Sequence, residues 1–372
     1  MTAADSQRRP LRVAVEGLYA TEGLTDGGGR FLSNALRALG RRDDVEVTAY
    51  VGPSTRDAVR AIPGLADVVE LPAGGRAARL LSQHVRLPRA AGRRGADALL
   101  CLGNYAPVAG GPPVVAFVQN LLLAQHDPSY GRARAAYRQV ARRGLARAAQ
   151  IVAISEAMAR ELSAAMGLPD GRVKVVRAGV DSELFGAPAE PPPDAPVPYL
   201  IAVGTIWSYR DYPLALDALS ESGLPHTLAI AGGAAPEERA KLEAHARERG
   251  LGDRLRILGV QSQEDLRRWY AGADALIATS SLEAFPLSPL EAMAAGVPVV
   301  AAARSGYPEA IGDGGVLADP TPAALADGLR RAVDPGKRER LVAAGRARAA
   351  ELSWDSCAAG LVDVCRAAVN GS

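Results

Sequence analysis

The sequence is poor in cysteine, lysine and histidine, and it has no long uninterrupted apolar run. Three cysteines in 372 residues cannot make a disulfide framework and lack the paired short spacing of a structural zinc site, so we expect a reducing compartment. The most apolar stretch, residues 292–303, is interrupted by Gly296 and Pro298 and is too short to span a bilayer. Because the first residues also lack an apolar signal-type core, the sequence predicts a soluble, cytoplasmic protein.

The charge balance gives no sign of a nucleic-acid partner. The 43 basic and 41 acidic side chains leave a net charge of +2, so nothing global draws the chain to a polyanion. Only three of the basic residues are lysine, which, with the abundant alanine, indicates GC-rich codon usage and makes arginine counts weak as a binding signal. With 48% hydrophobic and 23% charged residues, the composition is that of a globular chain long enough for two α/β domains.

Short β-branched runs alternate with alanine- and leucine-rich helical stretches, a rhythm that predicts βαβ units and parallel sheets. We expect strands over residues 11–16, 45–51, 98–102, 114–118, 151–154, 173–176, 199–203, 227–231, 255–258, 275–278 and 297–301. Between the two halves, Gly186 to Pro198 carries six prolines and can be neither helix nor interior strand. The sequence therefore predicts an N-terminal domain over residues 1–185, a hinge over 186–198 and a C-terminal domain over 199–352.

Ligands of open parallel sheets bind beyond the carboxyl ends of the strands, so the loops there are the candidates. Gly27 to Gly29 follow the first strand and precede a helix that starts near Phe31; they form either a phosphate-binding turn or a flexible one. Their spacing is not the dinucleotide pattern. Arg210 follows strand 199–203 and is either a forked diphosphate ligand or a solvated loop arginine.

The segment from residue 280 to 298 carries the densest signal. Ser288, Pro289 and Glu291 have the spacing of a capping box at the start of a short helix, which gives Glu291 a structural role. A carboxylate also accepts hydrogen bonds from ribose hydroxyls, and the same helix end would receive the attached phosphates. Glu283 has no capping role, so it is the better candidate for contact with a polar ligand.

The run from Glu283 through Phe285 and Ser288 to Glu291 and Gly296 resembles the E-x7-E signature of retaining GT-B glycosyltransferases of family four. Further resemblances occur in order along the chain, at residues 27–29, 154–156, 179–185, 203–204, 258–260, 308–315 and Trp354. The resemblance implies an α/β GT-B fold, with two Rossmann-like parallel-sheet domains facing across a cleft. It also implies that a last helix, within residues 353–372, crosses back to the N-terminal domain.

The same resemblance implies that the C-terminal domain holds a nucleotide-diphosphate-sugar donor. Glu291 would bind its ribose, and Glu283 would contact its sugar near the reacting face. The family usually has a basic residue and a lysine where this chain has Thr205 and Arg210. Of the two cationic side chains that would bind the diphosphate, only one is therefore kept, as Arg210. The other donor-binding residues would be Gly28, Gly29, Thr205, Val260, Phe285, Pro286, Leu287 and Ser288. No metal and no further cofactor is expected.

The acceptor is expected in the N-terminal domain, near Asn104 and Tyr105. Many relatives have a histidine after the strand that ends at residue 118, where this chain has Gln119 and Asn120. Glutamine cannot act as a base, but in a front-face retaining mechanism the leaving diphosphate oxygen takes the acceptor proton. Gln119 and Asn120 then only form hydrogen bonds. His126 either replaces the missing group or is simply solvated.

The implied activity is a metal-independent, hexosyltransferase-type retaining glycosyltransferase. Its acceptor would be a small molecule, a lipid-linked molecule or a glycan, in natural-product, cell-wall or polysaccharide biosynthesis. Arginines at 134, 138, 142, 143 and 147 favour a solvated helix face over a membrane-surface contact. Two alternatives stay open: a nucleotide-sugar epimerase or hydrolase of the same fold, and a catalytically degenerate donor-binding partner subunit. The oligomeric state is not indicated.

Overall fold

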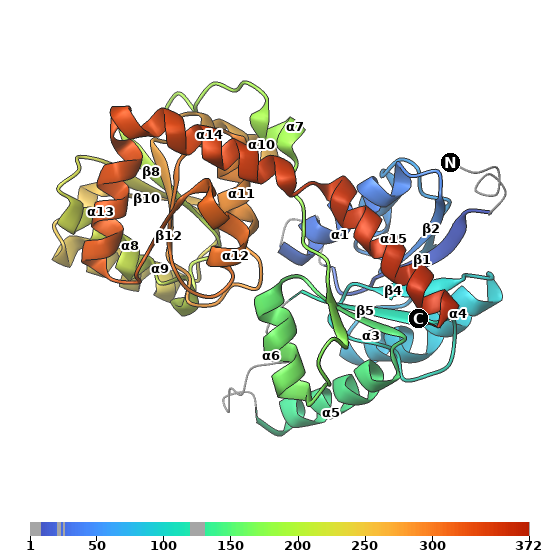
Figure 1. Cartoon of the computed structure of the whole chain (residues 1–372). Coiled ribbons are helices and arrows are strands. Elements are labelled where there is room, and N and C mark those ends of the chain that lie inside the picture. Colours follow the sequence, from blue (N-terminus) through green and yellow to red (C-terminus); the bar gives the residue numbers. More distant parts are fainter. Residues whose placement is uncertain (1–8, 21–23, 25–26, 120–130, 372) are drawn as a thin grey trace. The chain divides into compact units, whose positions relative to one another are not determined.

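The computed structural model of the chain describes residues 9–20, 24, 27–119 and 131–371 (Figure 1). The chain divides into two compact units. Unit 1 comprises the chain up to Ala178 together with the segment from Trp354 onward, and unit 2 runs from Gly179 to Ser353. Each unit is a parallel β-sheet with helices packed on it, and each is described below by itself.

Unit 1 has a seven-stranded parallel sheet in the order β3-β2-β1-β4-β5-β6-β7. Its strands are β1 (Leu11–Gly17), β2 (Val45–Val51), β3 (Asp67–Glu70), β4 (Ala98–Cys101), β5 (Val114–Val118), β6 (Gln150–Ala153) and β7 (Val173–Val175). Its helices are α1 (Gly27–Gly40), α2 (Arg56–Arg60), α3 (Arg76–Leu81), α4 (Leu87–Arg93), α5 (Gly131–Arg147), α6 (Glu156–Met166) and α15 (Trp354–Asn370). A π-helical turn, Ser82–Arg86, joins α3 to α4.

Unit 2 has a six-stranded parallel sheet in the order β10-β9-β8-β11-β12-β13. Its strands are β8 (Tyr199–Val203), β9 (Thr227–Ala231), β10 (Leu255–Gly259), β11 (Ala275–Ala278), β12 (Val299–Ala302) and β13 (Val316–Ala318). Its helices are α7 (Ser182–Gly186), α8 (Tyr212–Ser222), α9 (Pro236–Glu248), α10 (Gln263–Ala271), α11 (Leu287–Ala294), α12 (Tyr307–Ile311), α13 (Pro322–Val333) and α14 (Pro335–Glu351).

In both sheets the strand order reverses beside the first strand of the unit, between β1 and β4 in unit 1 and between β8 and β11 in unit 2. The loops that leave these neighbouring strands diverge to opposite faces of the sheet and leave a crevice for a ligand at the carboxyl ends. The prediction of two Rossmann-like parallel-sheet domains is confirmed, and each has one such reversal point.

The division between the units falls at residues 178 and 179, before the hinge predicted over residues 186–198. Helix α7 belongs to unit 2 because Phe185 packs edge-on against Tyr270, with ring centroids 5.8 Å apart. The proline-rich segment is also fastened to unit 2, where Arg256 pairs with Asp194 and Arg267 donates to the carbonyl oxygen of Pro188. The proline-rich segment is irregular, as predicted, and side chains of unit 2 bind it.

Two short strands, β3 and β13, are absent from the strands that the sequence predicted. Each lies at or near the end of its sheet and is only four or three residues long. Strand β12 begins at Val299, two residues later than predicted, because Pro298 cannot donate a ladder hydrogen bond. The remaining strands start and end within a residue of their expected limits.

Helix α15 completes the core of unit 1, where it lies beside α1 (Figure 1). Trp354 opens this helix and packs edge-on against Phe31 of α1 at a centroid distance of 5.4 Å. Phe31 in turn contacts Phe117 of β5 at 4.9 Å. This aromatic chain joins the last helix to the sheet, so the end of the sequence is part of the first unit's core. In the described part of the chain, no helix combines the length and apolarity needed to cross a bilayer.

We expect Trp354→Ala to lower the free energy of unfolding of unit 1 by about 3 kcal/mol, because it empties a buried aromatic site. Trp354 is 6% exposed, whereas Trp207 is 52% exposed and serves as the matched control. Chemical denaturation should show a change of under about 0.5 kcal/mol for Trp207→Ala. Equal effects of the two substitutions would contradict this account of α15.

Candidate active site

Three loops at the carboxyl ends of β8, β11 and β12 are joined by hydrogen bonds in unit 2. The Ser281 backbone N–H donates to the carbonyl oxygen of Tyr209 at 2.7 Å, and the Thr279 hydroxyl donates to that of Arg210 at 3.0 Å. The third loop adds an ion pair between Arg304 and Asp211 at 2.6 Å. The backbone around Arg210 is therefore held by both neighbouring loops.

The backbone of Glu283 is fixed in the same way. The Ser305 hydroxyl accepts from the Glu283 N–H at 2.7 Å and donates to its carbonyl oxygen at 2.8 Å. The Gly306 N–H donates to the same carbonyl oxygen at 2.8 Å. A Cβ on Gly306 would lie 2.7 Å from the carbonyl oxygens of Glu283 and Ala284, so this close approach requires glycine.

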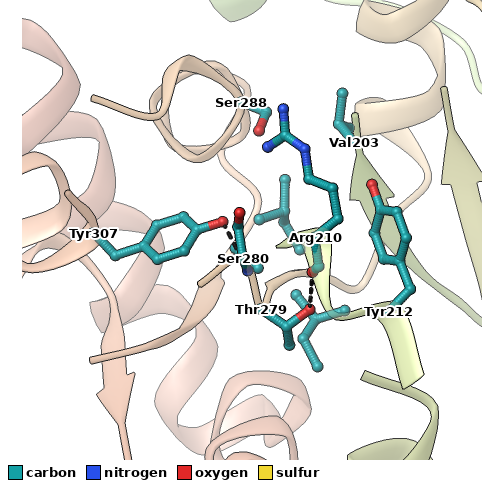
Figure 2. Close-up of a pocket in the computed structure, with 10 residues that line it drawn as sticks. Val203, Arg210, Tyr212, Thr279, Ser280, Ser288 and Tyr307 are labelled. Atoms are coloured by element: carbon teal, nitrogen blue, oxygen red, sulfur yellow. Dashed lines mark hydrogen bonds between the residues drawn. The ribbon is translucent and has the colours of Figure 1, made fainter. Parts of the chain in front are cut away.

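A small cavity lies where these loops meet, and Figure 2 shows the side chains around it. Arg210 extends between Tyr212 and Tyr307, and its guanidinium is directed toward Ser288. The cavity has a volume of about 10 Å³, on the order of one water molecule. The cavity is therefore too small to hold a diphosphate.

Arg210 and Glu283, the two predicted catalytic residues, form an ion pair with each other. The side chains are 22% and 15% exposed, so little solvent screens the pair. Burial raises the pKa of Glu283 above its ordinary value, and the neighbouring guanidinium acts against this rise. Burial is the largest influence on Arg210 and opposes its charged form, but the Glu283 carboxylate and the neighbouring tyrosine hydroxyls together outweigh burial, so the Arg210 pKa is raised. Among the described residues, the buried Nε–H of this arginine nevertheless has no hydrogen-bond partner.

Glu291 is not part of a capping box, and that prediction is wrong. Helix α11 begins two residues earlier than expected, with Pro286 instead of Ser288 at the N-cap position and no side-chain cap. Glu291 therefore lies beyond the first turn, where it is 3% exposed and accepts a hydrogen bond from the Tyr270 hydroxyl at 3.2 Å. The ribose contact of Glu291 stays a prediction, and the Glu291 side chain is buried in this structure.

The other predicted donor residues of unit 2 lie at the same end of the sheet. Phe285 and Pro286 are buried ahead of α11, while Leu287 and Ser288 form its first turn. Helix starts leave their first backbone N–H groups without an intrahelical acceptor. Thr205 is exposed after β8, and Val260, 71% exposed, follows β10. Their contacts with a donor remain predictions.

In unit 1, the three glycines form the first turn of α1 and not a loop ahead of it. Gly28 accepts a hydrogen bond from the Tyr19 hydroxyl at 3.2 Å, and Gly29 is buried. Their predicted phosphate contacts stay predictions, now placed at a helix start. Within the ranges that the structure describes, no three His, Cys, Asp or Glu side chains gather as a metal site.

The predicted acceptor residues Asn104 and Gln119 are in contact. The Asn104 side chain accepts the backbone N–H of Gln119, and the Gln119 amide donates to the Tyr19 hydroxyl at 3.2 Å. Tyr105 is 3% exposed beside them. Asn120 and His126 lie outside the described residues. Strand pairing of β4 with β5 thus brings together residues that the sequence separates.

Both units match known families. The model "Glycosyltransferase Family 4" matches residues 25–184, and "Glycosyl transferases group 1" matches residues 187–348. The chain belongs to the GT-B glycosyltransferases. The pair of matches follows the two units, so the GT-B architecture and the family agree.

Individual GT-B relatives agree with this assignment. A D-inositol 3-phosphate glycosyltransferase from Xylanimonas cellulosilytica is 34% identical over 242 residues, 58% of this chain and 58% of that protein. The matched region thus spans little more than half of this curated relative. The fold matches sucrose-phosphate synthase from Thermosynechococcus elongatus with a TM-score of 0.76 at 20% identity, covering 96% and 98% of the two chains. Anabaena Alr3699/HepE in complex with UDP-glucose gives a TM-score of 0.72 at 19% identity, covering 95% and 99%.

The structure of this GT-B chain reveals one candidate residue that the sequence reasoning missed. Glu16, the last side chain of β1 before Gly17, is 0% exposed. Burial raises its pKa to about 7, against the hydrogen bonds that it accepts. A single acid directly after the apolar run from Val13 to Val15, at a position where a ligand loop begins, is the signal that could have found it.

We expect Glu16→Gln to raise the free energy of unfolding at pH 8 by on the order of 2 kcal/mol, with a smaller gain at pH 5. The raised pKa means that the folded protein keeps a proton which the unfolded chain loses between pH 4.5 and about 7. Wild-type stability therefore falls as pH rises through this window. Glu46→Gln, at an exposed position of β2, is the control and should leave this dependence intact. Equal destabilisation by Glu16→Gln at both pH values would refute the account.

Proposed function

We propose that this chain transfers a sugar from a nucleoside diphosphate sugar to an acceptor hydroxyl, with retention of anomeric configuration. The supporting observation is the meeting of Arg210 and Glu283 at the reversal point of the unit 2 sheet. A forked cation and a carboxylate, both shielded from water, suit a reaction in which a diphosphate leaves and positive charge develops on a sugar. Unit 2 would bind the donor, and unit 1 the acceptor.

Arg210 would bind the diphosphate through its guanidinium fork. The backbone N–H groups of Leu287 and Ser288, at the start of α11, would add donors for the same oxygens. Together they meet the negative charge that grows as the diphosphate departs. We propose that the reaction therefore needs no divalent metal.

In the proposed reaction the acceptor oxygen attacks the anomeric carbon from the face that the diphosphate leaves. The bond between the anomeric carbon and the diphosphate oxygen breaks as the new glycosidic bond forms, and the leaving oxygen takes the acceptor proton. Retention follows because attack and departure share one face. Glu283 would orient the sugar and support its developing positive charge.

The ion pair implies competition at the donor site. Glu283 neutralises Arg210 in the ligand-free protein and the cavity between the loops is about 10 Å³. A diphosphate must therefore displace the carboxylate from the guanidinium. The displaced Glu283 is then available to the sugar, so donor binding and placement of the carboxylate are one exchange.

Related proteins suggest which substrates to use first. UDP-glucose is the ligand named for the Anabaena structure, and D-inositol 3-phosphate is named for the curated relatives. We propose a test with the full chain and UDP-glucose, alongside other nucleoside diphosphate sugars, with D-inositol 3-phosphate as the first acceptor. Acceptor-dependent nucleoside diphosphate release with an unchanged anomeric configuration by NMR would support the proposal, and chelation with EDTA should not reduce the rate.

The alternatives give other outcomes in the same assay. Equal donor consumption with and without acceptors would identify an epimerase or hydrolase. Tight nucleotide binding without any turnover across the acceptor panel would identify a donor-binding subunit. Inversion at the anomeric carbon would refute the retaining mechanism alone.

We expect Glu283→Gln to tighten binding of UDP roughly fivefold and to slow sugar transfer at least about 100-fold. The substitution frees Arg210 for the diphosphate but removes the carboxylate from the sugar. Calorimetry with UDP and the transfer assay measure the two effects. Glu264→Gln is the control, because Glu264 also pairs with an arginine but lies 57% exposed on α10. Unchanged UDP affinity in Glu283→Gln would rule out the exchange.

We expect Glu291→Gln to reduce the preference for UDP over 2′-deoxy-UDP by roughly tenfold, since a neutral amide is a weaker partner for ribose hydroxyls. Tyr270→Phe removes the hydroxyl that now binds this carboxylate and should leave the preference intact or increase it. Calorimetric titration of both nucleotides measures the ratio. A ratio that Glu291→Gln leaves unchanged would mean that the ribose binds elsewhere.

A further inference from the structure

A fully buried carboxyl lies beneath the predicted acceptor residues of unit 1. Oε1 of Glu16 accepts the Leu18 backbone N–H at 2.8 Å. Oε2 faces Gly103, where an added Cβ would lie 2.8 Å from this oxygen. Oε2 makes no hydrogen bond of ordinary geometry in the described structure. One carboxyl therefore lies against the loop after β1 and the loop after β4 at once.

The β4 loop above this carboxyl holds Asn104 in a constrained conformation. Asn104 has a φ of +63°, in the left-handed region that asparagine enters more readily than most residues. The Gln119 amide donates to the carbonyl oxygen of Leu102 at 2.6 Å, which ties the loop to the end of β5. Such strained positions persist only where surrounding contacts determine them. Glu16 lies against the neighbouring Gly103.

The π-helical turn Ser82–Arg86 forms another wall of the same cluster. The Gln83 side chain and the Tyr105 hydroxyl both face the Glu16 carboxyl and favour its ionised form. The His84 ring packs edge-on against Tyr105, with centroids 5.4 Å apart. π-helical turns occur frequently at functional sites. Here the turn places the Gln83 side chain near the Glu16 carboxyl and the His84 ring against Tyr105.

We propose that Glu16 is a positioning residue of the acceptor site, whose ionised carboxylate holds the loop from Leu102 to Tyr105 in the conformation that receives the acceptor. The acceptor role of this loop rests on the proposed function. Glu16 itself is buried and does not touch the acceptor. It acts through the backbone at Gly103 and through the Tyr105 hydroxyl.

The groups around Glu16 explain why a carboxylate is needed. The backbone N–H groups of Leu18 and Gly103, the Gln83 amide and the Tyr105 hydroxyl are all donors that face it. A carboxylate only accepts hydrogen bonds, whereas glutamine must direct an NH₂ group toward one of these donors. A buried carboxyl also lowers stability at neutral pH, and residues that lower stability are retained mainly where function needs them.

The proposal makes the loop sensitive to pH near neutrality. With a Glu16 pKa of about 7, the carboxylate is present at pH 8 and largely protonated at pH 6. Loosening of the loop removes the Gly103 and Tyr105 donors, which favour the ionised form, and leaves the carboxyl covered by the other elements. The loop itself is therefore held at the higher pH and loosened at the lower, even though the buried charge lowers the stability of the whole fold. The other titratable groups around Glu16 are Tyr19 on the β1 loop, Tyr50 on β2, His84 on the π-helical turn, and Cys101 and Tyr105 on β4 and its loop. Burial raises the pKa of Cys101 and Tyr50, so these two stay neutral across this range, and it lowers the pKa of His84, which favours the neutral ring.

Hydrogen–deuterium exchange of the ligand-free full chain tests the proposal directly. After correction for intrinsic rates, protection of residues 102–105 should fall about tenfold from pH 8 to pH 6, in step with the ionised fraction. Glu16→Gln should abolish this dependence, and Glu46→Gln should preserve it. Protection that is independent of pH in the wild type, or a dependence that survives Glu16→Gln, would overturn the proposal.

Tyr105→Phe keeps the test decisive if Glu16→Gln does not fold. Loss of a hydroxyl that favours the carboxylate should raise the Glu16 pKa, so the midpoint of the exchange profile should move to higher pH. An unmoved midpoint would count against Glu16 as the titrating group.

The transfer assay separates this proposal from the proposed function. With UDP-glucose and D-inositol 3-phosphate, Glu16→Gln should raise the acceptor KM about tenfold and leave kcat and UDP affinity near wild type. An equal loss of UDP affinity would show a general structural defect and overturn the positioning role. Absence of transfer by the wild type with every acceptor would refute the proposed function, while the exchange experiment would still decide the role of Glu16.

Discussion

The carboxyl ends of parallel strands all meet at one edge of a sheet, and the chemistry of this chain depends on that constraint. In unit 2 it brings Arg210, which follows β8, to Glu283, which follows β11. In unit 1 it brings Glu16 at the end of β1 to the loop after β4. Each cluster lies where the strand order of its sheet reverses. The connections between strands therefore determine which polar side chains meet.

The two clusters handle buried charge in different ways. Arg210 and Glu283 compensate each other, so unit 2 keeps a cation and an anion away from water until a ligand exchanges with one of them. Glu16 has only neutral donors around it, and burial shifts its pKa to about 7. One cluster thus responds to a charged ligand, whereas the other responds to protons. In both clusters, hydrogen bonds from residues distant in the sequence fix the backbone of a neighbouring loop.

Sequence reasoning located most strands because their β-branched runs are buried on both faces and differ sharply from the helices between them. It misplaced the start of α11, because Ser288 and Glu291 match a capping box that packing does not use. The Glu291 carboxylate does not cap the helix and accepts a hydrogen bond from Tyr270 of another helix. Sequence reasoning missed Glu16 because a charge at a strand end carries no motif, and only burial makes it unusual.

The sequence by itself determined the alternating βαβ pattern and the family resemblance, and it singled out Arg210 and Glu283 as candidate site residues. These follow from local periodicity and from residues close together in the chain. The tertiary structure decided that the proline-rich segment is fastened to unit 2, that α15 completes unit 1, and that Arg210 and Glu283 pair. Those outcomes depend on contacts between segments far apart in the chain, and such contacts exist only after the sheets have formed.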